Sequence, residues 1–69
     1  MPVTVRYSGP GPFEVYLDGN YMGTGTGGSF SFSAPAGTHY VRVWDGSFNY
    51  ERSILFQSGV SKIINVEAA

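Results

Sequence analysis

Apolar and polar positions alternate with a period of two through most of the chain. The clearest stretch is residues 13–18, where Phe13, Val15 and Leu17 alternate with polar residues and a tyrosine. This period is expected when one face of a strand meets a core and the other meets water. The following Asp18-Gly19 favours a tight primed turn, because both residues tolerate positive φ. The pattern predicts a β-hairpin over residues 13–25, with residues 20–25 as its return strand.

The same alternation recurs before and after this hairpin. It predicts further strands at residues 2–8, 29–33, 38–44, 48–57 and 60–67, separated by turns rich in glycine and proline. No window has the apolar spacing of a helix longer than two turns. Short strands about 8 to 12 residues apart are typical of a sandwich or small barrel. We therefore predict that residues 1–69 form one all-β domain, a small antiparallel β-sandwich of six to seven short strands.

The strand at residues 38–44 has large side chains on both faces, so its orientation must be argued. One face carries Val41 and Val43, and the other carries Tyr40, Arg42 and Trp44. Small β-branched residues suit the interior of a sandwich, whereas an arginine does not. We expect the two valines to face inward, with Tyr40 and Trp44 outside.

Composition and charge exclude several classes of protein. The chain has no cysteine, so it has no disulfide and no thiolate metal ligand. Its four basic residues are scattered and its net charge is −1, whereas a nucleic-acid binder normally has a basic patch. Only 13% of the residues are charged, against about 25% in a typical soluble domain, which makes self-association easier.

No targeting or membrane-spanning segment is apparent. No stretch reaches the roughly 20 apolar residues that cross a bilayer, and the first residues form an alternating strand rather than a signal peptide. We expect no membrane insertion. The compartment stays open: cytoplasmic if the chain is taken literally, or the cell envelope or surface if it is a fragment of an exported protein.

The residues that could take part in catalysis or ligand binding fit structural roles. His39 is the single histidine and has no cysteine or second histidine with which to build a metal site. Asp18 and Asp45 precede glycine, as turn aspartates do when they accept the amide two residues on. The glycines of residues 23–28 superficially resemble a phosphate loop, but a strand follows where a helix would be needed. We predict no catalytic residue, metal ligand or cofactor, and hence no enzymatic activity.

The core assignment leaves four aromatic residues over, namely Tyr16, Tyr21, Tyr40 and Trp44. Exposed Tyr and Trp are enriched at the centres of protein interfaces, and they also stack on sugar rings. These four are our candidate interaction residues. The alternative is that both faces are covered or that one strand has the opposite parity, which would make Trp44 part of the core.

The expected strand edges bear on the kind of interface. The N-terminal strand has one arginine and the C-terminal strand one lysine, which is weak protection for exposed edges. The leading hypothesis is a non-catalytic structural or protein-interaction module that forms a symmetric homo-oligomer through the aromatic face or by edge-strand pairing. The alternative is a lectin-like, carbohydrate-binding module that uses the exposed Tyr and Trp. A third possibility is an inert spacer in a longer envelope protein.

Two segments resemble the PEGA-type domains. Residues 17–24 contain an aliphatic-Asp-Gly turn followed four residues later by glycine, and residues 36–43 read Ala-Gly-x-His-x-Val-x-Val. The resemblance covers about residues 3–50. Of the family's Pro-Glu-Gly-Ala, only the proline is matched at residues 10–13, and the proline that the family has after the hairpin is missing. It implies a small β-sandwich related to transthyretin-like and immunoglobulin-like domains, with a binding or scaffolding role in bacterial or archaeal surface proteins and no catalytic residue.

Overall fold

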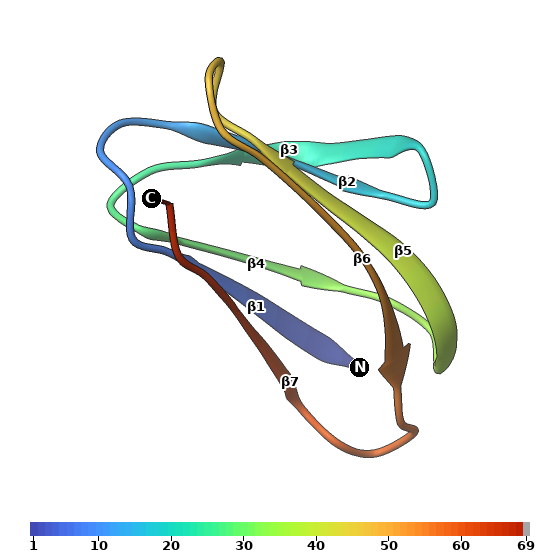
Figure 1. Ribbon diagram of the computed structural model, residues 1–69. Helices are drawn as coiled ribbons and strands as arrows, with labels where there is room; N and C mark the ends of the chain where they lie inside the picture. The colour runs from blue at the N-terminus through green and yellow to red at the C-terminus, as the bar shows by residue number, and fades with distance from the viewer. Residues whose placement is uncertain (69) are drawn as a thin grey trace.

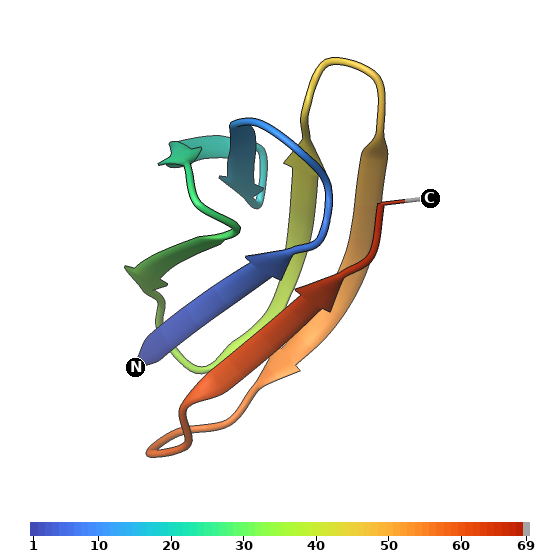
Figure 2. The ribbon, with the colours of Figure 1, turned by 90° about the vertical axis from the view of Figure 1, so that its left-hand side faces the viewer.

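A computed structural model describes residues 1–68. Within these residues, seven strands form two sheets packed face to face (Figures 1 and 2). The strands are β1 (Pro2–Tyr7), β2 (Phe13–Leu17), β3 (Asn20–Gly25), β4 (Ser29–Ser33), β5 (Gly37–Trp44), β6 (Asn49–Phe56) and β7 (Lys62–Val66). The sheet orders are β4-β1-β7 and β3-β2-β5-β6. The predicted all-β sandwich is confirmed.

Most strand bounds agree with the predicted ones, and the last strand differs most. It begins at Lys62 rather than at Val60, because Gly59 has a φ of 77° and the Val60 N–H turns back to donate to Gln57 O at 3.2 Å. The hairpin turn is of the predicted primed type, since Asp18 and Gly19 have φ values of 51° and 84°.

The place of β1 corrects two expectations. The N-terminal strand is not an edge: β1 lies in the middle of the small sheet, antiparallel to β4 and parallel to β7. The sandwich is therefore not purely antiparallel. The four edges are β3 and β6 of the large sheet and β4 and β7 of the small one. Because β1 and β7 run side by side in the same direction, the start of β1 and the end of β7 lie at opposite ends of the small sheet (Figure 1).

The alternating apolar residues meet between the sheets and form the core. Val41 and Val43 are fully buried, as predicted. Among residues 1–68, no polar or charged side chain is buried. The buried hydrophobic residues are Val3, Val5, Tyr7, Phe13, Val15, Leu17, Ala34, Val41, Val43, Phe56, Ile64 and Val66.

The two sides of the sandwich differ (Figure 2). On one side, the chain passes from β3 into β4, and the Phe30 side chain of β4 lies against Gly23 and Gly25 of β3. A Cβ on Gly25 would be 2.7 Å from Phe13 Cε2 and 2.8 Å from Phe30 Cβ, so only glycine fits there. On the other side, β6 and β7 are both edges, and no ladder joins them within the described residues. The first side is closed by side chains, and the second is open.

Candidate functional site

The outer surface of the large sheet carries all four candidate aromatic residues. Tyr16 on β2 lies opposite Tyr21 on β3 and opposite Arg42 on β5, and Trp44 on β5 lies opposite Glu14 on β2. We call this surface the aromatic face, defined by Tyr16, Tyr21, Tyr40, Arg42 and Trp44. Tyr21 is 57% and Tyr40 45% exposed, and the other two aromatic residues are half-buried. Trp44 is not among the core residues.

A bulge in β3 helps to build this face. The pairing of β2 with β3 shifts by one residue between Val15 and Tyr16, which leaves Met22 as the extra residue on β3. Tyr21 can then lie beside Tyr16 on the outer surface while Gly23 lies opposite the buried Val15. The Tyr16 and Tyr21 rings are 5.6 Å apart between centroids and are tilted by 59°.

Arg42 lies at the centre of the face, although it is not among the four interaction residues predicted from the sequence. Its guanidinium carbon is 5.3 Å from the centroid of the Tyr16 ring and 5.6 Å from that of Trp44. Its Nε donates a hydrogen bond to Asn49 Oδ1 at 2.8 Å. A cation over an aromatic ring at an exposed site contributes about 0.5–1 kcal/mol. The signal that could have identified Arg42 is its position between Tyr40 and Trp44 on the outward parity.

Hydrogen bonds to carboxylates fix the hydroxyl groups of Tyr16 and Tyr40. The Tyr16 hydroxyl donates to Glu14 Oε1, and the Tyr40 hydroxyl donates to Glu51 Oε1, each at 2.5 Å. These hydrogen bonds raise the pKa of both tyrosines, and the bonds from Tyr40 and from Asn49 lower the pKa of Glu51. Tethered rings lose little rotamer freedom on binding. The aromatic face is therefore preorganised for contact.

His39 has a hydrogen-bond partner at each ring nitrogen. Its Nδ1 lies 2.5 Å from Asp18 Oδ2 and its Nε2 2.9 Å from Pro35 O, and its ring packs on Phe56. Both ring nitrogens face acceptors, an arrangement that the imidazolium satisfies best. The hydrogen bond to Asp18, followed by that to Pro35, raises the pKa of His39.

The two turn aspartates differ. Asp45 accepts the Ser47 N–H at 2.9 Å, two residues on as predicted, and also the Tyr7 hydroxyl. The bond from Tyr7 is the main cause that lowers the pKa of Asp45 to about 2, while burial and the same bond raise that of Tyr7 to about 12. The local prediction is wrong for Asp18, which instead accepts the Tyr40 N–H of β5 at 2.8 Å. Asp18 therefore ties the hairpin tip to the neighbouring strand.

The described residues form neither a metal site nor a phosphate-binding loop. Within residues 1–68, no three His, Asp or Glu side chains gather closely enough to hold a metal ion. The glycine-rich turn after β3 leads into β4, and the Gly28 carbonyl accepts the Tyr7 N–H at 2.8 Å. That carbonyl completes the backbone pairing of β1. In the described part of the chain, no helix is long and apolar enough to cross a membrane.

Fold and site together define a small two-sheet β-sandwich with an aromatic surface on its larger sheet. Comparison of the chain with protein-family models, curated proteins and solved structures finds no match.

Proposed function

We propose that the protein is a non-catalytic interaction module that associates with a second copy of itself through the aromatic face. The observation that carries this proposal is the set of tethered, partly exposed rings around Arg42. Aromatic residues and arginine are the residue types most enriched in the energetic centres of interfaces.

The charges of the face support a symmetric contact. In a two-fold interface, the same patch meets itself, so a favourable patch must be complementary to its own copy. This face carries Arg42 together with Glu14 and Glu51. One protomer's guanidinium can therefore meet its partner's carboxylates.

The area of the aromatic face sets the expected strength of the association between two copies. Four strands about 4.8 Å apart and about 20 Å long present roughly 400 Å². Stable interfaces bury about 800 Å² on each partner. We therefore expect a weak dimer whose population rises with concentration.

Light scattering over a concentration series tests the proposal. The apparent mass of the wild type should rise from 7.4 kDa toward twice that value. Trp44→Ala and Tyr21→Ser should each weaken the association by about tenfold or more. The matched control is Ile63→Ala, which removes a 53% exposed side chain from β7 of the other sheet. A wild type that stays monomeric, or an equal effect of the control, would refute the proposal.

Carbohydrate binding is the second candidate function, because Tyr and Trp rings flanked by Arg42, Asn49 and Glu51 can stack on a sugar and bond its hydroxyls. The hollow beside Trp44 measures about 170 Å³, below the ~300 Å³ typical of ligand pockets. The size of the hollow favours the protein interface. Trp44 is the single tryptophan, so its fluorescence reports on this face alone. No change across a panel of oligosaccharides would remove this candidate.

We also propose that the chain is a PEGA-type domain, on the basis of the motifs at residues 17–24 and 36–43. Both motifs have clear places in the fold: the first contains the β2–β3 turn, and the second forms most of β5. The strand pairing differs from that of an immunoglobulin constant domain, in which the first two strands pair in one sheet. Here β1 and β2 lie in different sheets.

A further inference from the structure

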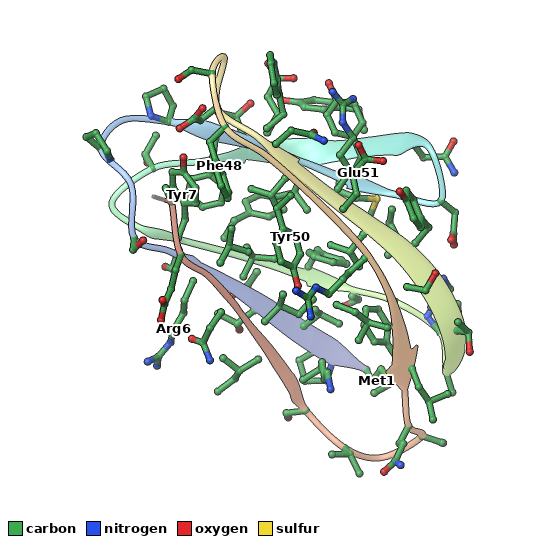
Figure 3. All side chains as sticks on the ribbon, viewed as in Figure 1. Met1, Arg6, Tyr7, Phe48, Tyr50 and Glu51 are labelled. Atoms are coloured by element: carbon green, nitrogen blue, oxygen red, sulfur yellow. The ribbon has the colours of Figure 1, made fainter. Side chains whose placement is uncertain are left out.

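The open side of the sandwich contains a groove between β6 and β7, with a volume of about 420 Å³. Its apolar lining comes from Tyr50, Ile54 and Leu55 of β6 and from Ile63 and Ile64 of β7. Figure 3 shows Tyr50 and Glu51 on opposite sides of β6, Tyr50 pointing into the space between the sheets. The groove is therefore separate from the aromatic face, to which Glu51 belongs.

Two of the chain's four basic residues lie in this groove. Arg52 pairs with Val41, and Lys62 pairs with Val3. Both valines are fully buried, so the two cations point from their strands on the core-facing side. The Arg52 guanidinium carbon lies 5.6 Å from the centroid of the Tyr50 ring.

The groove has positive charge without a neutralising partner. None of the described residues that line it is acidic, and the salt bridge found within residues 1–68 involves neither Arg52 nor Lys62. Charges that point inward at sheet edges oppose pairing between like edges. A second copy of the groove would bring four cations together, whereas a carboxylate-bearing partner would neutralise them.

The sheets also differ by one strand. The small sheet ends at β7, and the large sheet it packs against extends one strand further, to β6. The position beside β7 and across from β6 is therefore vacant in the strand order. An added strand there would bond to the unpaired backbone edge of β7 and cover the apolar lining.

We propose that the β6–β7 groove binds an extended acidic segment of another protein. The segment pairs with β7 as a fourth strand, places carboxylates beside Arg52 and Lys62, and packs its apolar side chains against Ile54 and Ile64. Affinity for the extended form comes from the β7 backbone, and preference for acidic sequences comes from the two cations.

Fluorescence anisotropy with labelled peptides of about ten residues tests this proposal. A peptide that repeats Glu-Ser-Val-Ser, the Glu-Val peptide, places Glu and Val in turn on one face of an extended strand. It should bind at least about tenfold more tightly than the same repeat with Lys in place of Glu, the Lys-Val peptide, and added salt should weaken the binding. A version of the Glu-Val peptide that is methylated on every backbone nitrogen has no N–H to donate to a ladder and should fail to bind. Equal binding of the Glu-Val and Lys-Val peptides, or tight binding of the N-methylated peptide, would overturn the proposal.

Variants and amide exchange locate the site. Arg52→Ser with Lys62→Ser should reduce the affinity for the Glu-Val peptide by about tenfold or more. Arg6→Ser, which removes an exposed cation from β1, is the charge control and should leave the affinity for the peptide unchanged. Hydrogen exchange of β7 amides should slow in the complex, because an added strand gives them partners. Loss of binding with Arg6→Ser alone, or no change at β7, would place the peptide elsewhere. Trp44→Ala should bind the peptide normally, so this proposal and the proposed function fail separately.

Discussion

The closed side and the open side of the sandwich use opposite residue types. At the β3–β4 side, glycines remove side chains so that the Phe13 and Phe30 rings can pack against the backbone of β3. At the β6–β7 side, Arg52 and Lys62 place charges where core residues would otherwise stand. The sandwich is therefore asymmetric in composition: hydrophobic side chains fill one side, and the other side stays accessible.

Removing the large ring from the closed side should have the largest effect. Phe13 is 1% exposed and its ring centroid lies 4.8 Å from that of Tyr7. Phe13→Ala should cost about 3–5 kcal/mol, comparable with the roughly 3–10 kcal/mol expected for the whole domain. Urea unfolding should show a midpoint far below that of the wild type. A fully cooperative transition at the wild-type midpoint would contradict the assigned core.

A single methyl group on the closed side should have the next largest effect. Gly25→Ala forces a Cβ into the space that the Phe13 and Phe30 side chains occupy, and overpacking of this kind costs about 1–3 kcal/mol. On the open side, Ser53→Ala is the matched change of one small group on an exposed strand position, and it should stay within about 0.5 kcal/mol. Similar urea midpoints for the two variants would remove the distinction between the sides.

Making the open side apolar should change association more than stability. Arg52→Val with Lys62→Val removes the inward charges from the two edges, so the edges should pair between molecules. Light scattering should show larger species than the wild type forms at the same concentration, while the thermal midpoint of dilute protein shifts by no more than a few degrees, as expected for under about 1 kcal/mol. An unchanged mass would mean that these cations do not protect the edges.

The smallest expected effect is a pH dependence at the His39–Asp18 pair, which links the hairpin tip to β5. The folded-state pKa of His39 is raised above its ordinary 6.5, so its stabilisation is complete below pH 6.5 and is lost as pH rises through the folded value. The pKa of Asp18 is lowered from 3.8, so its stabilisation is complete above pH 3.8 and is lost as pH falls through its folded value. The pair therefore contributes most between these two values.

Thermal melts of the wild type and of His39→Gln check this dependence. The wild-type midpoint should decline by roughly a few degrees as pH rises past 6.5 toward 8, and the variant should lack that decline. Tyr7 and Asp45 do not account for it, because their pKa values of about 12 and about 2 lie outside this range. A parallel decline in the variant would assign the effect to another group.

Local features of the fold were predictable from the sequence, and long-range ones were not. Alternation gave the strands and correctly placed Val41 and Val43 inside, because each side chain's face depends on its own strand. The Asp18-Gly19 turn also depends on adjacent residues. The central place of β1 and its parallel pairing with β7 join residues far apart in the chain, and no strand pattern specifies its partner.

The residues of the candidate site were likewise predictable only where their position depends on a single strand. Parity alone was enough to place Tyr16, Tyr40 and Trp44 on an outer surface. The contacts of Arg42 with rings on two different strands, and the position of Arg52 and Lys62 in one groove, depend on the sheet order. These groups were visible in the sequence as scattered charges, and only the topology brings them to shared surfaces.

The parallel pairing of β1 and β7 has a mechanical consequence. Tension applied at the start of β1 and at the end of β7 pulls the two neighbouring strands in opposite directions along their length. Their five paired positions, from Val3 with Lys62 to Tyr7 with Val66, then carry the force in shear and share it. In a hairpin pulled open from its free ends, the bonds break one after another. The strand order thus gives this small domain a geometry that resists stretching along the direction of β1 and β7, with its unfolding rate under force set by the β1–β7 ladder.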